Sequence, residues 1–519
     1  MTFEIVFVLL SLLGMVAALI ADKMRPGMIL FSVVVLFLCA GILTPKEMLE
    51  GFSNKGMITV ALLFLVSEGI RQSGTLGQVI KKLLPQGKTT VFKAQLRILP
   101  SVAFISAFLN NTPVVVIFAP IIKHWAKSVN LPATKFLIPL SYVTILGGIC
   151  TLIGTSTNLV VHGMILEAGF EGFSMFELGK VGIFIAIAGI IYIFLFSKRL
   201  LPDARPDTAV PDEEVEEGEK LHRVEAVLGA RFPGINKKLK DFNFQRHYGA
   251  EVKEIKTRNG QRFVSNLEEV VLHEGDTLVV MADDTFIPTW GESSVFVLLT
   301  NGNEPDTTGK KKKKRWFALL LLVLMIVGAT VGELPITKEM FPDIKLDMFF
   351  FVSITTIIMA WTNLFPARKY TKYISWDILI TIACAFAISK AMVNSGVADS
   401  VAKFIIGLSD DYGPHVLLAM VFIITNLFTE LITNNAAAAL AFPLALSISA
   451  QLGVSPTPFF VVICMAASAS FSTPIGYQTN LIVQGIGNYK FTDFVRIGLP
   501  LNIITFLISI ILIPLIWNF

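Results

Sequence analysis

The residues best suited to binding chemistry form two polar motifs, and each motif occurs twice in the chain. Segment 151–159 reads TLIGTSTNL, and segment 473–481 reads TPIGYQTNL, 322 residues later. A second pair precedes them, with SAFLNNT at 106–112 and TELITNN at 429–435. Threonine, serine and asparagine offer oxygens to a cation and neutral donors to an anion, without the desolvation cost of a full charge. The spacing therefore predicts two related ion-binding breaks in otherwise apolar sequence.

Each half of the chain offers a similar set of candidate ligands. They are Ser106, Asn110, Asn111, Thr112, Thr151, Gly154, Thr157 and Asn158 in the first half, and Thr429, Thr433, Asn434, Asn435, Thr473, Gly476, Thr479 and Asn480 in the second. Glycine permits the backbone to turn, and Pro113 and Pro474 remove a backbone donor near each break. Small polar residues also join packed membrane helices. Their duplication in register favours a binding site over packing alone.

The elements that must position these residues are predicted to be membrane helices. The 519 residues are 54% hydrophobic and 16% charged, whereas soluble domains carry about 25% charged residues. The first apolar run, 2–20, has no basic segment before it and no cleavage site, so we expect a retained helix. The four cysteines show no metal-ligand spacing. Predicted spans are 3–21, 27–44, 56–72, 134–163, 173–198, 316–334, 347–365, 373–395, 455–486 and 491–518.

Two further stretches, 94–127 and 414–447, each carry a polar tip between two short apolar arms and are predicted to be re-entrant hairpins. Non-helical backbone survives at membrane depth only when it is buried in protein or lines a wet cavity. With an external N-terminus, all the basic clusters fall on the cytoplasmic side. The first hairpin then enters from the cytoplasm and the second from outside. We therefore expect an α-helical inverted repeat with two broken helices.

A hydrophilic insert separates the membrane halves, so the expected domains are 1–202, 203–308 and 309–519. The insert opens with an acidic linker at 211–220, and EVKEIKTRNGQRF predicts two strands joined by an Asn-Gly turn. Both flanks are basic, which places the insert in the cytoplasm. The run GKKKKKRW at 309–316 is expected to anchor the next helix beside acidic lipid rather than to bind nucleic acid.

The NNT and TNN tips, the Thr-Glu pair before the second tip and the paired T-x-I-G-x-x-T-N segments resemble the divalent anion/sodium symporter (DASS) family of the ion transporter superfamily. The resemblance covers nearly the whole membrane part and implies a dimer that works by an elevator movement. It assigns a first sodium site to Ser106, Asn111, Gly147, Gly148 and Gly154, and a second to Thr429, Asn434, Ala469 and Thr473. It assigns the anion to Asn111, Thr112, Asn434 and Asn435. From the polar motifs themselves we also predict substrate contacts for Asn110, Thr433, Thr157, Asn158, Thr479 and Asn480. The tips of family members read Ser-Asn-Thr. Here Asn110 and Thr433 replace the serine and Asn435 replaces the threonine, so the resemblance does not decide which anion binds.

The insert resembles the TrkA C-terminal domain, also called the regulator of potassium conductance (RCK) C-terminal domain. The residues that carry this likeness are FPGINKKLKDFNFQRHYGAEVKEI and the ending HEGDTLVVMADD. Such domains bind small ligands between two copies, in some systems cyclic di-AMP. One domain is found here, so a symmetric pair requires a homodimer. The chain has no GxxxxGK[ST] loop, and we expect no ATP hydrolysis.

Charged residues within the predicted spans are functional candidates by default. Glu68 either has a functional role or faces Arg71 at the membrane edge. Glu430 adjoins the second tip and is expected to support the cation site. Asp377 and Lys390 lie in the same predicted span. We expect Lys390 to extend to the membrane surface or to form an ion pair.

The sequence predicts a multi-pass plasma-membrane symporter that couples sodium to a small divalent anion and is regulated by its insert. Sulfate or a related oxyanion is favoured over a dicarboxylate mainly because the chain resembles insert-bearing members of the family, and no arginine clamp for a bidentate carboxylate is evident. Three alternatives stay open, namely a sodium/dicarboxylate symporter, an arsenite or sodium/proton carrier, and a ligand-gated channel. No catalytic dyad or nucleophile motif is present, so an enzyme is not expected.

Overall fold

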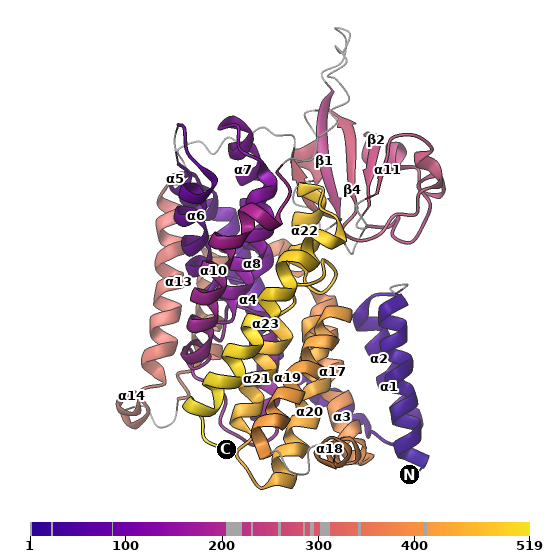
Figure 1. The fold of residues 1–519 in the computed structure, drawn as a ribbon, viewed down its shortest axis with the longest axis vertical. Coiled ribbons are helices and arrows are strands. Elements are labelled where there is room, and N and C mark those ends of the chain that lie inside the picture. The colour runs from indigo at the N-terminus through magenta and orange to yellow at the C-terminus, as the bar shows by residue number, and fades with distance from the viewer. Residues whose placement is uncertain are drawn as a thin grey trace.

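The chain folds into a helical bundle with a small β-sheet at one end (Figure 1). The start of α1 and the end of the chain lie at the other end of the bundle. The computed structural model describes residues 3–21, 24–85, 87–203, 221–229, 232–257, 261–283, 286–290, 295–300, 312–340, 344–407 and 413–519.

The first half forms the two predicted breaks as helix–loop–helix units. Its helices are α1 (Phe3–Ala21), α2 (Pro26–Cys39), α3 (Pro45–Glu50), α4 (Lys55–Ser73), α5 (Thr75–Leu83), α6 (Val91–Ser106), α7 (Asn111–Ser128), α8 (Leu137–Gly148), α9 (Ser156–Glu167) and α10 (Gly179–Leu200). The first hairpin is α6 and α7, with its tip at 107–110. The overlong span predicted at 134–163 is broken between α8 and α9, where the TxIG segment lies.

The second half repeats this order of hairpin and broken helix. Its helices are α13 (Lys312–Gly332), α14 (Pro335–Met340), α15 (Met348–Trp361), α16 (Tyr370–Tyr373), α17 (Trp376–Asn394), α18 (Val397–Gly407), α19 (Gly413–Leu431), α20 (Asn434–Leu452), α21 (Thr457–Ser468), α22 (Gln478–Gly487) and α23 (Phe491–Ile516). The second hairpin is α19 and α20. The second broken helix is α21 and α22.

The helices have the length and surface of membrane spans. Eight described segments are long and apolar enough to cross a bilayer: 3–21, 45–73, 179–200, 314–332, 376–394, 413–431, 434–452 and 491–516. Four apolar helices are shorter, and two of these, α8 and α21, are halves of the broken helices. Four apolar side chains of α23 are about half exposed and recur every four residues: Leu499, Ile503, Leu507 and Ile511. They form one apolar stripe that can face lipid.

The insert forms a five-stranded antiparallel sheet in the order β3-β2-β4-β1-β5. The strands are β1 (His222–Leu228), β2 (Glu251–Lys256), β3 (Arg262–Phe263), β4 (Thr277–Ala282) and β5 (Phe296–Thr300), with short helices α11 (Phe244–Tyr248) and α12 (Phe286–Trp290). The predicted strand pair around the Asn-Gly turn is β2 and β3. The turn residues themselves, 259–260, and the acidic linker lie outside the described residues.

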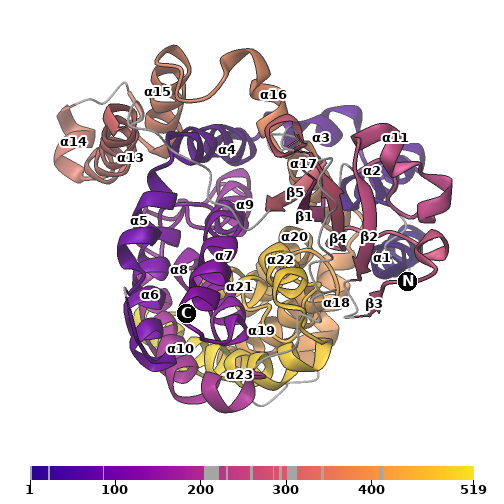
Figure 2. The same cartoon turned by 90° about the horizontal axis from the view of Figure 1, so that it is seen from above.

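Helices near the edge of the bundle surround the hairpins. Seen from above, α13 and α15 lie at one edge, with α4 between them and α9 (Figure 2). On another side α2 packs on α17, which packs in turn on α20. The two broken helices contact each other's half, because α9 packs on α20 and α21 while α22 packs on α7 and α8. This interleaving brings the four polar breaks together.

Candidate ion and substrate site

The first tip is held by a hydrogen bond between its two ends. The Ser106 hydroxyl, at the end of α6, donates to Asn111 Oδ1 over 2.8 Å. Asn111 opens α7, so the free N–H groups of the first helical turn also lie at the tip. Both side chains are buried, with exposed fractions of 0% and 1%. The tip therefore presents oriented oxygens and donors away from bulk water.

The second tip repeats this arrangement with threonine in place of serine. The Thr429 hydroxyl lies 3.1 Å from Asn434 Oδ1, and Asn434 opens α20. The same hydroxyl lies 2.6 Å from the Ala467 carbonyl oxygen, at the end of α21. The hydroxyl and carboxamide are five residues apart in both tips, as the sequence alignment of the two motifs predicts.

Each TxIG segment is tied to its own hairpin in the same way. The Thr151 hydroxyl donates to the Ala107 carbonyl, and the Thr473 hydroxyl donates to the Glu430 carbonyl over 3.2 Å. The backbone N–H groups of Gly154 and Gly476 each donate to the threonine hydroxyl three residues earlier, at 3.2 Å. The two halves thus share a detailed hydrogen-bond pattern as well as a motif.

Asn158 and Asn480 hold the broken backbone together. Asn158 Nδ2 donates to the Thr151 carbonyl over 2.9 Å, and Asn480 Nδ2 donates to the Thr473 carbonyl over 3.1 Å. Both asparagines are fully buried. Thr479 is also buried and receives a hydrogen bond from Ser141. The predicted contact of all three with the anion stays a prediction; in this structure Asn158 and Asn480 also bind carbonyls that the helix breaks leave free.

One oxygen of this arrangement has no hydrogen-bond partner among the described atoms. Asn480 Oδ1 accepts from the Ser141 hydroxyl over 2.6 Å, whereas Asn158 Oδ1 is buried and unpaired. Ile463 holds the place in the second half that corresponds to Ser141, so it offers no hydroxyl to Asn158. A buried acceptor without a partner costs about 1–3 kcal/mol. A cation at the first break would remove that cost.

The tips of opposite halves meet through side chains of the broken helices. Asn111 Nδ2 donates to the Tyr477 hydroxyl over 2.6 Å, and the Thr112 hydroxyl lies 3.3 Å from Gln478 Oε1. Asn435 Oδ1 accepts from the hydroxyls of Ser156 and Thr157, each at 3.3 Å. Sequence reasoning did not single out Tyr477 or Gln478. Their signal was present, because Tyr477 and Gln478 fill two of the three positions where TPIGYQTNL departs from TLIGTSTNL.

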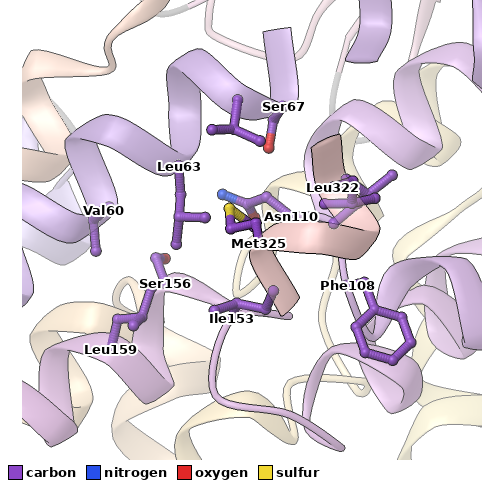
Figure 3. A pocket seen from close by; sticks show the side chains of 12 residues that line it. Val60, Leu63, Ser67, Phe108, Asn110, Ile153, Ser156, Leu159, Leu322 and Met325 are labelled. Carbon is purple, nitrogen blue, oxygen red and sulfur yellow. The ribbon is translucent and has the colours of Figure 1, made fainter. Parts of the chain in front are cut away.

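The remaining predicted tip residues, Asn110 and Thr433, lie at the edge of this cluster. Thr433 is exposed. Asn110 is half-buried and lines a small, mainly apolar pocket between the first tip, α4 and α13 (Figure 3). Leu63 and Met325 face Asn110 across this pocket. The wall between the tip and the neighbouring helices is thus largely free of polar contacts.

The predicted glycine positions are ones where only glycine fits. A Cβ on Gly148 would lie 2.6 Å from Asn111 Oδ1, and a Cβ on Gly147 would collide with the Ala103 carbonyl. A Cβ on Gly154 would lie 2.5 Å from the Gly148 carbonyl oxygen. These close approaches bring backbone carbonyls against the first tip. The carbonyl oxygen of Ala469, a residue predicted at the second sodium site, accepts a hydrogen bond from Asn426 Nδ2 over 2.6 Å.

Glu430 fixes the second broken segment. Its carboxylate accepts hydrogen bonds from the backbone N–H groups of Ser472 and Thr473, each at 2.9 Å, and from Asn502 Nδ2 at 2.7 Å. Ala107 holds the corresponding position in the first half. The second break therefore carries a fixed carboxylate that the first one lacks.

The other charged candidates lie apart from the tips. Glu68 accepts two hydrogen bonds at 2.7 Å from Arg71 on the same helix, which confirms the pairing considered from sequence. Asp377 accepts from the backbone N–H of Gly27 over 3.2 Å, and Lys390 is exposed. Among the described residues, no group of three or more His, Cys, Asp or Glu side chains is placed to hold a metal ion.

A multi-pass helical bundle in which two hairpins meet two broken helices at neutral polar tips is the architecture of a membrane transport protein. Comparison with known proteins identifies the family. The chain belongs to the CitMHS family, described as citrate transporters, whose profile matches residues 16–448 and 344–518.

Individual relatives extend over different parts of the chain. An uncharacterized transporter of Synechocystis sp. is 30% identical over 94% of this chain and 93% of its own length. Sodium/sulfate cotransporter 1 of Chlamydomonas reinhardtii is 33% identical over 55% of this chain and 32% of its own length. Human solute carrier family 13 member 4 is 25% identical over 30% of this chain and 24% of its own length.

Proposed function

We propose that this protein is a sodium-coupled symporter of small divalent anions, with sulfate as the preferred substrate. The observation that carries the proposal is the matched pair of hydroxyl–carboxamide tips, each tied to its own broken helix by the same hydrogen bonds. Two relatives named sodium/sulfate cotransporters support the coupling ion and the anion.

The sodium ions would bind where oxygens already converge. The first site would use Ser106, Asn111 and the carbonyls near Gly147, Gly148 and Gly154, and the unpaired Asn158 Oδ1 gives it a further oxygen. The second would use Thr429, Asn434 and the backbone near Ala469 and Thr473. Because every tip side chain is neutral, bound cations would supply the charge that a desolvated dianion requires.

The anion would bind between the two tips. Asn111, Thr112, Asn434 and Asn435 would turn their donors towards it, with Asn110 and Thr433 at the margin and Thr157 beside Asn435. Carboxamide and hydroxyl donors suit a compact oxyanion. A dicarboxylate is the second candidate, and the description of the family as citrate transporters favours it.

Alternating access would follow from two halves of opposite orientation. In Figure 1, α7 lies at the end of the bundle near the sheet, and α20 lies towards the other end. This supports an inverted repeat with the insert in the cytoplasm and an external N-terminus. The apolar pocket wall beside Asn110 would let the tips slide along α4 and α13 in an elevator movement within a homodimer.

The insert would regulate transport through the elements that carry the tips. Glu225 of β1 lies 3.0 Å from Lys123 Nζ of α7, and β5 packs on α7. A Cβ on Gly485 of α22 would lie 2.5 Å from the Thr277 hydroxyl, so β4 begins directly against the second broken helix. A ligand that moves the sheet would therefore also displace α7 and α22. Cyclic di-AMP is the ligand that the TrkA-C resemblance suggests, and calorimetric titration of the full chain tests it.

Uptake into proteoliposomes tests the function. Inward sodium gradients should drive accumulation of radiolabelled sulfate, and replacement of sodium by potassium should abolish it. Non-radioactive sulfate should compete better than succinate. Sodium-driven uptake of succinate without sulfate would reverse the order of substrates. Continuous single-channel current would instead favour a channel.

A further inference from the structure

One hydroxyl group connects all four polar breaks of the molecule. Tyr477 precedes α22 and is 9% exposed. Its hydroxyl accepts from Asn111 Nδ2 over 2.6 Å and lies 3.0 Å from the Thr155 hydroxyl. It also lies within hydrogen-bonding reach of Asn434. The first hairpin, the first broken helix and the second hairpin therefore all meet the residue supplied by the second broken helix.

Within the paired polar motifs, the position of Tyr477 is where the two halves differ most in side-chain volume. Thr155 is its counterpart in the first half, 322 residues earlier. Both residues have an extended backbone immediately before the second arm of a broken helix. Each ends in a hydroxyl, and the two hydroxyls meet. The aromatic ring adds volume on one side only, so the space between the tips is narrowed from the second half.

We propose that Tyr477 determines which anion the site accepts, an inference that rests on the symport function proposed above. The phenol can turn its single proton from Thr155 to an anion oxygen while it still accepts from Asn111. The ring shortens the space available along the line between the tips. A compact tetrahedral dianion fits this arrangement, whereas a longer dicarboxylate must displace the ring.

Two substitutions separate the hydroxyl from the ring. Y477F removes only the donor, and Y477T reproduces the side chain of the other half. Y192F is the matched control, because Tyr192 is a buried tyrosine of α10 whose hydroxyl lies 3.0 Å from the Ile497 carbonyl oxygen. Sulfate and succinate uptake are measured for all three variants with a fixed sodium gradient.

Y477F should raise the KM for sulfate about tenfold with a maximal rate within about twofold of wild type, since a hydrogen bond to a charged group is lost. Y477T should shift the ratio of succinate to sulfate uptake towards succinate by about tenfold. Y192F should change neither value. Unchanged selectivity in both Tyr477 variants would overturn the inference, because a residue that only supports the fold alters total uptake and not the ratio.

Thermal stabilisation of the detergent-solubilised protein gives a binding measurement that does not depend on transport. Sodium sulfate should raise the Tm of wild type and Y192F more than that of Y477F. Equal shifts, or no shift in the wild type, would overturn the role of Tyr477. Absence of uptake by a wild type that does show the Tm shift would count against the carrier function alone.

Discussion

At the scale of single residues, the site is built from neutral oxygens and one carboxylate. The hydroxyls of Ser106 and Thr429 occupy equivalent positions, because each contacts the carboxamide oxygen of the asparagine five residues later. Glu430 has no such match, because Ala107 takes its place in the first half. A carboxylate that accepts two backbone N–H groups holds the second break in one conformation. We therefore expect the two cation sites to differ in affinity.

Replacing Glu430 by glutamine should weaken sodium binding. In either orientation the new NH2 group faces a backbone N–H at the distance where the carboxylate accepted, which costs about 1–3 kcal/mol. The sodium concentration for half-maximal uptake should rise about tenfold. E68Q is the control, because Glu68 pairs with Arg71 away from the tips. Loss of coupling in E68Q, with none in E430Q, would point to a proton carrier instead.

At the scale of elements, function depends on two helices that stop and restart at depth. Asn158 and Asn480 bind the carbonyls left free, and the threonines of each TxIG segment bind the hairpin. Glycine is required where these segments pass close to other backbone. The breaks are thus held by hydrogen bonds to side chains in place of those of a regular helix.

Replacing Gly154 by alanine should damage the first break. The added methyl group would lie 2.5 Å from the Gly148 carbonyl oxygen and 3.0 Å from that of Ala107, and backbone atoms cannot move aside cheaply. We expect a loss of about 1–3 kcal/mol of stability and at least a tenfold loss of uptake. G77A should behave like wild type, since a Cβ there meets nothing within 4 Å. Thermal unfolding and sulfate uptake provide the two measurements.

At the scale of the whole molecule, the sheet of the insert and the helical bundle are joined at α7 and α22. Val227 of β1 belongs to the same apolar core as the membrane helices. Lys123 contributes the ion pair to this junction, with Lys256 of the sheet at 3.4 Å from the same carboxylate. Motion of the first hairpin or of the second broken helix must therefore strain or release the sheet.

Replacing Lys123 by alanine should loosen the sheet from α7. The half-buried pair contributes roughly 1–2 kcal/mol, so hydrogen exchange in β1 should become several-fold to about thirtyfold faster. K127A is the matched control, because Lys127 lies on the same helix and is exposed. Equal exchange rates in the two variants would show that the ion pair contributes nothing to docking.

The same junction should resist acid. Burial by itself raises the pKa of Glu225. The positive charges of Lys123 and Lys256 lower it by more, so the net pKa falls from the usual 4.5 to about 2. Lys256 belongs to the same sheet as Glu225, so only the part of the lowered pKa that comes from Lys123 stabilises docking. This part is fully present above about pH 4.5 and is lost as the pH falls towards 2. Protection of β1, corrected for intrinsic exchange, should be the same at pH 7 and pH 5 and fall below pH 4. E225Q should show no such change.

The sequence by itself predicted the registered pairs of polar breaks and most of the spans. The predicted spans 27–44 and 347–365 correspond to helices of 14 residues, α2 and α15, and both arms of the second hairpin are longer than predicted, long enough to cross a bilayer. Hydropathy and helix length control these features locally, and the duplicated motif fixes which residues correspond. Ser106 with Asn111 and Thr429 with Asn434 could be paired in advance because each pair lies within one tip. The contact of Asn158, Thr479 and Asn480 with the anion stays a prediction. The hydrogen bonds of the two asparagines to broken backbone could not be predicted, because a polar motif does not show which way its side chains face.

Only the tertiary structure decided which breaks touch each other. The contact between Asn111 and Tyr477 joins residues 366 positions apart, and that between Lys123 and Glu225 joins a membrane helix to the sheet. Such contacts depend on how helices pack and which rotamer each side chain adopts, and neither is encoded in local spacing. For the same reason, the sequence identified Glu430 only as a charge near the second tip. Its hydrogen bonds to the backbone of Ser472 and Thr473 were visible only in the tertiary structure.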